Sequence, residues 1–235
     1  TEGIHAFTFN GSVITQVGTF NTANSAQSIW GDGTYIYVAD NLDPDLLAYT
    51  FDGTSFVQVG SIAAFAPIID VWGDGTYIYT AGSNGIGAYT FDGLAFTQIA
   101  TLASPGDGFG IWTDKKYVYL ADGTGGGIIA YSFDGSTFTQ IDSFDTAGEA
   151  QEIWGDGTYI YVADQTGGLH AFTFDGSTFI QVDTIALGAT TVDVWGDGTH
   201  IFVADGTSGI HALKFNGVNF VLIDTFDTPN SAQDL

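Results

Sequence analysis

The sequence predicts an all-β protein built from a repeated four-stranded unit, and three observations support this. First, the stretch Trp-Gly-Asp-Gly-Thr-Tyr-Ile-Tyr-Val-Ala-Asp at 154–164 has related copies beginning at Trp30, Trp72, Trp112 and Trp195, at spacings of 42, 40, 42 and 41 residues. Second, each repeat contains four short runs rich in Tyr, Phe, Ile, Val and Thr. Third, no stretch shows the apolar period of a helix. A period of about 40–45 residues with four strands per repeat is typical of a β-propeller blade.

One repeat shows the expected order of elements. Its four strands are expected at 151–154, 159–164, 168–174 and 179–182. Gly-Asp-Gly separates the first two strands and Asp-Gly the last two, and Asp-Gly favours a two-residue hairpin turn with positive φ. The second strand is apolar almost throughout, which is typical of a strand buried on both faces. We expect the five tryptophans to be buried near the first strands, and no helix longer than about two turns.

The copies do not occur in equal numbers. The third and fourth strands occur six times but the first two only five, and 231–235 matches 25–29, the start of a first strand. We therefore expect a single domain over 1–235, a six-bladed propeller with an incomplete blade shared by both termini. A five-bladed ring is the alternative. The expected pieces are the third and fourth strands of the closing blade at 1–25, complete blades at 26–66, 67–107, 108–148, 149–190 and 191–227, and the first strand of the closing blade at 228–235.

The composition is strongly acidic. The chain has 27 Asp and Glu residues against three Lys and no Arg, giving a formal net charge of −24. A chain with so few cations does not neutralise phosphates, so we expect no nucleic acid partner. No apolar run reaches the ~18 residues of a membrane helix, so we expect no membrane insertion. Neither Cys nor Met occurs. The first absence leaves the redox compartment undecided, and the second indicates a mature protein or a fragment.

The repeat resembles a known family. Tyr-Ile-Tyr-Val-Ala-Asp at 159–164, followed by Gly-Leu-His-Ala-Phe at 168–172, is similar to the LVIVD-repeat propellers of bacteria and archaea. The resemblance extends over the chain blade by blade and implies a secreted or cell-surface propeller of largely unassigned function. It departs in the third strand, where Ala-Phe-Thr-Phe-Asp-Gly replaces Val-Ile-Asp-Ile. It carries no catalytic residue across, because the shared residues are structural.

Residues that differ between repeats are the better candidates for function, because residues common to all repeats are explained by folding. The turns after the first and third strands are nearly uniform Asp-Gly turns. The loops after the second and fourth strands vary, and loops held by a rigid scaffold commonly carry function. The binding residues predicted there are Asn24, Asp43, Asp45, Phe65, Asp107, Phe109 and Glu149.

Acidic residues recur at one position of the first strand. The residue before its Ile or Val is acidic in four of six copies, namely Asp70, Glu152, Asp193 and Asp234. Several carboxylates around a central channel would suit Ca²⁺ or another divalent cation. The alternative is a hydrated acidic lining without a specific ion. If an ion binds there, millimolar calcium should raise the melting temperature beyond the effect of matched sodium chloride.

Histidine recurs in the third strand, at His5, His170 and His211. Zinc binding is one interpretation. Packing between blades is the other, and it is favoured because equivalent positions on neighbouring blades lie too far apart to share one ion.

Two function classes remain open. The first is a secreted or cell-surface scaffold, without enzymatic activity, that binds a protein or glycan through its variable loops; the missing catalytic motifs favour it. The second is a cation-dependent hydrolase or lyase with its site at the channel mouth. The incomplete blade also predicts that the strand at 4–9 has an unpaired edge, pairs with the C-terminal segment, or takes up a strand of a neighbouring molecule by self-association.

Overall fold

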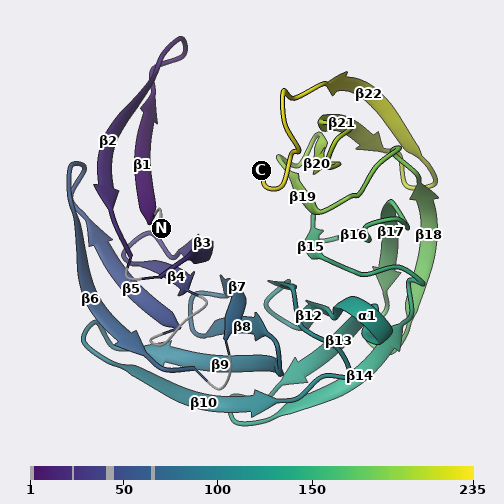
Figure 1. Ribbon diagram of the computed structural model, residues 1–235. Helices are drawn as coiled ribbons and strands as arrows, with labels where there is room; N and C mark the ends of the chain where they lie inside the picture. The colour runs from purple at the N-terminus through teal and green to yellow at the C-terminus, as the bar shows by residue number, and fades with distance from the viewer. Residues whose placement is uncertain (1–2, 23, 41–44, 65–66) are drawn as a thin grey trace. The chain divides into compact units, whose positions relative to one another are not determined.

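The computed structural model describes residues 3–22, 24–40, 45–64 and 67–235. The chain divides into two compact units, residues 1–102 and 103–235. Their described residues form one two-stranded sheet and five four-stranded sheets, all antiparallel, with the strands of each sheet in chain order (Figure 1). The one helix among them, α1 (Gly123–Gly126), is a single turn. No helix in these ranges is long and apolar enough to cross a membrane.

The first unit holds a hairpin and two complete sheets. The hairpin sheet consists of β1 (Ile4–Phe9) and β2 (Ile14–Phe20). Sheet I consists of β3 (Ala26–Gly31), β4 (Ile36–Asp40), β5 (Leu46–Phe51) and β6 (Phe56–Ile62). Sheet II consists of β7 (Ile68–Gly73), β8 (Ile78–Gly82), β9 (Gly85–Phe91) and β10 (Phe96–Leu102).

The second unit holds three complete sheets. Sheet III consists of β11 (Gly110–Thr113), β12 (Val118–Ala121), β13 (Ile128–Phe133) and β14 (Phe138–Phe144). Sheet IV consists of β15 (Glu152–Gly155), β16 (Ile160–Ala163), β17 (Leu169–Phe174) and β18 (Phe179–Ile185). Sheet V consists of β19 (Asp193–Gly196), β20 (Ile201–Ala204), β21 (Ile210–Phe215) and β22 (Phe220–Phe226).

Within each unit, consecutive sheets pack face to face through their inner strands. Tyr161 and Leu169 of sheet IV share one buried cluster with Val194 and Leu213 of sheet V. Sheets I and II form an equivalent cluster, which includes Tyr37 and Tyr89. The second strands of the complete sheets are therefore almost wholly buried, as their nearly continuous apolar sequence predicts.

The tryptophans connect one sheet to the next. Trp154 stacks on Tyr161 of its own sheet, with ring centroids 5.7 Å apart. Its ring also lies over Gly196 of the next sheet, where an added Cβ would meet it at 2.5 Å. This explains Gly after Trp in the repeat. The expectation of five buried tryptophans is wrong: Trp112 is buried, three others are half-buried, and Trp195 is 47% exposed in the last sheet.

The Asp-Gly turns differ from the expected two-residue form. In sheet I the turn runs from Asp32 to Tyr35, whose carbonyl accepts the Asp32 N–H at 3.1 Å. Within this turn φ is positive only at Gly33, at 89°. The Asp32 carboxylate accepts the N–H groups of Thr34 and Tyr35, each at 2.7 Å. The turn therefore needs only one residue with positive φ, because hydrogen bonds to the aspartate carboxylate hold the remaining turn residues in place.

Candidate functional site

A buried aspartate ends or directly follows the second strand in four of the five complete sheets. These residues are at most 1% exposed: Asp40, Asp122, Asp164 and Asp205. Sheet II has Gly82 at this position. A buried carboxylate is costly unless it is hydrogen-bonded, so its partners indicate its role.

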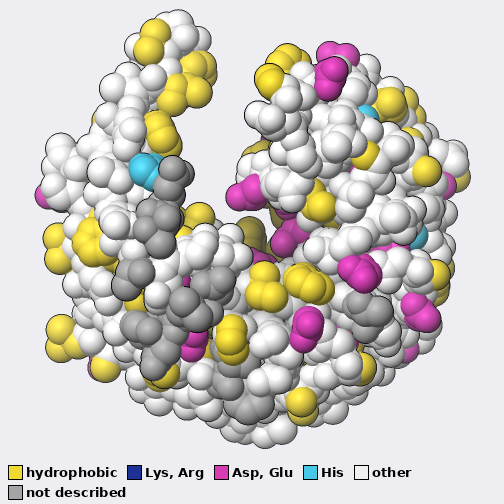
Figure 2. Space-filling view, in the orientation of Figure 1, with side chains coloured by type: hydrophobic (Ala, Val, Ile, Leu, Met, Phe, Trp, Pro, Cys, Tyr) yellow, Lys and Arg dark blue, Asp and Glu magenta, His cyan; other side chains and the backbone are white. Residues whose placement is uncertain are grey.

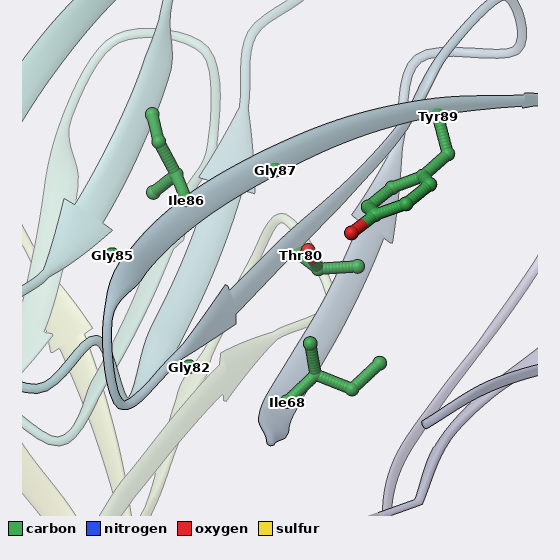
Figure 3. Close-up of a pocket in the computed structure, with 7 residues that line it drawn as sticks. All are labelled: Ile68, Thr80, Gly82, Gly85, Ile86, Gly87 and Tyr89. Carbon is green, nitrogen blue, oxygen red and sulfur yellow. The ribbon is translucent and has the colours of Figure 1, made fainter. Parts of the chain in front are cut away.

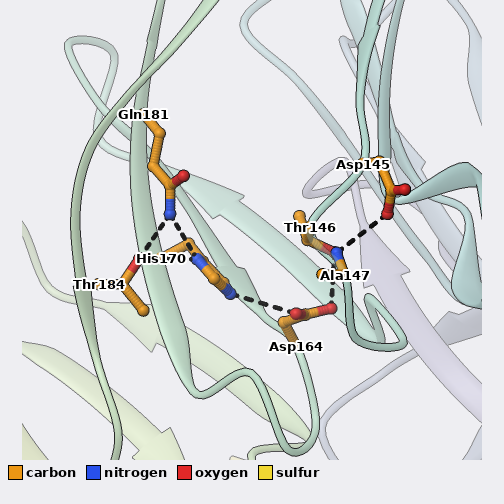
Figure 4. Close-up of polar contacts among 7 residues, drawn as sticks. All are labelled: Asp145, Thr146, Ala147, Asp164, His170, Gln181 and Thr184. Carbon is orange, nitrogen blue, oxygen red and sulfur yellow. Dashed lines mark hydrogen bonds and ion pairs between the residues drawn. The ribbon is translucent and has the colours of Figure 1, made fainter.

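In sheet IV the aspartate belongs to a hydrogen-bonded chain (Figure 4). Thr146 Oγ1, in the loop before the sheet, donates to Asp164 Oδ1 at 2.7 Å. His170 Nε2 lies 3.2 Å from Asp164 Oδ2, and His170 Nδ1 lies 2.9 Å from both Gln181 Nε2 and Thr184 Oγ1. Because an ionised carboxylate only accepts, Nε2 carries the proton and Nδ1 accepts from the Gln181 amide.

Sheets V and III repeat this arrangement with other partners. Asp205 accepts the Ala189 N–H at 3.0 Å and the Thr191 hydroxyl at 2.9 Å. His211 Nε2 is 3.4 Å from Asp205 Oδ2, outside hydrogen-bond geometry. In sheet III, Asp122 accepts the Gly106 N–H at 2.9 Å, and burial raises the pKa of its carboxyl. In these three sheets, therefore, the aspartate fixes the base of the loop that precedes its own sheet.

The predicted loop residues have different surroundings. Asp45 is buried, and its Oδ2 accepts the Ala64 N–H at 2.9 Å. Glu149 accepts the Gln165 side-chain amide at 2.7 Å. Asp107 is exposed, while Asn24 and Phe109 are half-buried. Asp43 and Phe65 lie outside the described residues.

The acids predicted for the first strands have different partners. In the first unit, Ser28 donates its hydroxyl to Asp70. In the second, the carboxyls of Asp193 and Asp234 are hydrogen-bonded to each other. Burial, followed by the charge of Asp234, raises the pKa of Asp193 to about 7. Glu152 accepts the N–H of Ile153 at 3.0 Å.

No metal centre is assembled by these contacts. Among the described residues, no three His, Asp or Glu side chains are grouped closely enough to hold a metal ion. His170 and His211 each bind residues of their own sheet, so the hydrogen bonds of these two histidines lie within single sheets. Cation binding at Asp70, Glu152, Asp193 and Asp234 stays a prediction.

The carboxylates of the turn aspartates accept hydrogen bonds from backbone N–H groups of their own turns. Asp175 Oδ1 accepts the N–H groups of Ser177 and Thr178 at 2.8 and 2.9 Å. The Ser177 hydroxyl and these amides lower the pKa of Asp175. The other Asp-Gly turns have the same geometry, so their carboxylates are explained by turn formation. On the face shown in Figure 2, Asp and Glu side chains are scattered and no Lys or Arg is in view.

A small pocket in sheet II replaces the aspartate–histidine pair of sheet IV. Its lining comprises Ile68, Thr80, Gly82, Gly85, Ile86, Gly87 and Tyr89. Figure 3 shows the Tyr89 ring of β9 reaching toward Thr80 of β8. The cavity measures about 10 Å³, roughly the room of one water molecule. It is too small for a sugar or peptide ligand.

Sequence reasoning missed the aspartate anchors and this pocket. The sequence carried a signal for both. Val-Ala-Asp recurs at the end of the second strand, but sheet II reads Thr80, Ala81, Gly82. The same sheet has Gly87 where sheets IV and V have His. Glycine at both of these positions in one repeat indicates where the pocket lies.

Comparison with known proteins agrees with this architecture. The LVIVD repeat model matches residues 23–43 and 147–170, and the second stretch contains both Asp164 and His170. The expected resemblance to LVIVD repeats is confirmed. No curated protein sequence matches the chain.

Solved structures resemble the chain over nearly its whole length. The periplasmic gluconolactonase of Pseudomonas aeruginosa is 14% identical with a TM-score of 0.83, covering 98% of this chain and 78% of that one. A functionally unknown protein from Desulfotomaculum acetoxidans is 14% identical with a TM-score of 0.81, covering 95% and 76%. A chain of a nidogen/laminin complex is 14% identical with a TM-score of 0.70, covering 100% and 94%. At these identities the likeness shows the fold alone, and the prediction of a β-propeller is confirmed.

Proposed function

We propose that the protein is a non-enzymatic binding scaffold that presents the variable loops between its sheets to a protein or glycan. The observation that carries this proposal is the aspartate anchor. In sheets III, IV and V a buried carboxylate holds the base of the loop before the sheet, while the loop sequences differ. A loop whose base is already fixed loses less conformational entropy when it binds a partner. The differing loop sequences would determine which partner binds. The proposal includes an extracellular or cell-surface location and no nucleic acid partner.

A panel of immobilised glycans and extracellular matrix proteins tests this proposal. The wild type is compared with a double variant, Asp107→Ala with Ala103→Ser, which changes an exposed loop and leaves the aspartate anchors intact. We expect at least one panel member to bind the wild type, and the variant to lose this binding without a change in melting temperature. Equal binding of the panel by both proteins, or by neither, contradicts presentation by this loop.

The carboxyl pair supports a second candidate, a hydrolase or lyase. A carboxyl group whose pKa is about 7 exchanges protons readily at neutral pH, as a general acid or base must. The structural likeness to a gluconolactonase suggests an uncharged lactone as a trial substrate. With three Lys against 27 acids, a phosphorylated substrate would be repelled.

Hydrolysis of glucono-1,5-lactone above the spontaneous rate, measured with and without calcium, tests this candidate. Loss of that activity in Asp193→Asn, with the fold retained, would favour the enzyme over the scaffold. A wild-type rate equal to the spontaneous rate removes this lactone as a substrate.

A further inference from the structure

Strands β1 and β17 have almost the same sequence but different surroundings. β1 reads Ile-His-Ala-Phe-Thr-Phe and β17 reads Leu-His-Ala-Phe-Thr-Phe. Each pairs with the next strand in the same register, with a bulge after its alanine. On its other edge β17 pairs with β16, whereas β1 is the end strand of a two-stranded sheet.

The exposure of matched side chains follows this difference. His170 and Phe172 of β17 are 5% and 0% exposed. Their counterparts in β1 are open: His5 is exposed, and Phe7 is 58% exposed. Figure 2 shows hydrophobic side chains exposed on this hairpin. An edge strand with unpaired backbone groups and exposed aromatic side chains is a template for another strand.

His5 indicates which residue an added strand should contribute. His5 Nδ1 lies 3.1 Å from Gln16 Nε2, as His170 Nδ1 lies 2.9 Å from Gln181 Nε2. The same tautomer therefore leaves Nε2–H of His5 directed away from β2. In sheet IV this N–H meets Asp164, the residue that follows β16. Among the described residues, no hydrogen bond to His5 Nε2 is found.

We propose that the open edge of β1 is a binding site for an extended peptide segment of the pattern Tyr-Ile-Tyr-Val-Ala-Asp. The segment adds to β1 as an antiparallel strand. The register of β16 on β17 places its Val opposite His5, its Ala opposite Ile4 and its second Tyr opposite Ala6. Its terminal Asp accepts a hydrogen bond from the Nε2–H of His5, and its apolar side chains cover Phe7.

Binding of a synthetic peptide tests the site. The probe is Gly-Thr-Tyr-Ile-Tyr-Val-Ala-Asp-Gly with a fluorescent label at its N-terminus, titrated with the 235-residue protein and followed by anisotropy. We expect saturable binding of one peptide per chain. Replacing the peptide Asp by Asn, or His5 by Ala in the protein, should weaken binding about tenfold, because each removes a charge-assisted hydrogen bond. His200→Ala is the matched control, since His200 belongs to an exposed turn of sheet V, and it should bind as the wild type does.

Hydrogen exchange locates the bound peptide. The amides of 4–9 should exchange more slowly with peptide present, while those of 169–174, already paired on both edges, should not change. A scrambled peptide that binds equally well overturns the proposal. So does the absence of saturable binding, or protection that arises outside 4–9. Self-association that the peptide does not reverse would assign the edge to a second copy of the chain instead.

Discussion

Sheets II and IV are built from the same repeat, yet they hold the preceding loop by different means. Sheet IV uses side chains: Asp164 binds Thr146 of the loop and His170 of the next strand. Sheet II uses the backbone. The Ser83 N–H donates to the Pro67 carbonyl oxygen at 3.2 Å. A Cβ added to Gly82 would lie only 2.3 Å from the same oxygen, so this close approach requires glycine.

The difference shows what the buried aspartate does. Both arrangements fix the loop against the end of the second strand. One uses a carboxylate that accepts hydrogen bonds from the loop, and the other uses a glycine that leaves room for a loop carbonyl. Where glycine replaces aspartate, the histidine position also becomes glycine, and a small cavity remains. The aspartate is therefore a structural anchor, and its loss should cost stability.

Removing the anchor should give the largest effect. Asp164→Ala leaves the His170 N–H and the Thr146 hydroxyl without their acceptor in a buried setting. We expect a loss of about 3 kcal/mol in the free energy of unfolding. Urea unfolding monitored by tryptophan fluorescence measures this. A loss below about 1 kcal/mol would mean that the loop has another anchor.

A single added methyl group should disrupt the backbone contact between Gly82 and Pro67 in sheet II. Gly82→Ala places a Cβ 2.3 Å from the Pro67 carbonyl oxygen, so the two segments must move apart. We expect a loss of about 2 kcal/mol. Gly31→Ala is the control, because its Cβ would meet only the Tyr35 carbonyl, at 3.5 Å. Equal stability losses in both variants would show that the strand propensity of alanine against glycine, rather than the close approach, decides the result.

These two sheets also show how far the sequence could lead. The period of the tryptophans and the four apolar runs were sufficient to predict the strands, their order and the β-propeller fold. The anchors were not recognised because Val-Ala-Asp recurs, and a recurrent residue was attributed to folding without a defined role. Exposure of Trp195 was missed for a related reason: a sequence repeat does not show which copies have a neighbouring sheet to pack on. The repeat pattern placed Asp193 and Asp234 at equivalent positions 41 residues apart, but it did not show that the two carboxyls touch and raise the pKa of Asp193.

Asp193, a half-buried acid that contacts another acid, should behave differently from Asp164. The pKa of Asp193 is raised to about 7, against about 3.9 in an unfolded chain. The stability contributed by its protonated form is therefore fully present below about pH 4 and lost as the pH rises through about 7. Asp193→Asn removes this dependence. We expect the variant to gain about 1 kcal/mol over the wild type between pH 5 and pH 8, or about 2–4 °C in melting temperature. A difference between the two proteins that is constant from pH 5 to pH 8 would contradict the raised pKa of Asp193.

The smallest effect should come from the same substitution made at a surface turn. Asp175→Asn keeps the acceptor oxygen of the turn, and Asn216 already shows this geometry: its Oδ1 accepts the N–H groups of Val218 and Asn219, each at 2.9 Å. The pKa of Asp175 is lowered, so whatever its charge contributes is present above about pH 4 and lost in acid. We expect the melting temperature at pH 7 to change by about 1 °C or less.

Asp164→Asn should lower the melting temperature by several degrees, because the buried site loses its charge-assisted hydrogen bond to His170. Calorimetry of the two asparagine variants side by side provides the measurement. Similar shifts in both would mean that burial does not distinguish the anchor from the turn, and the contrast drawn between these carboxylates would fail.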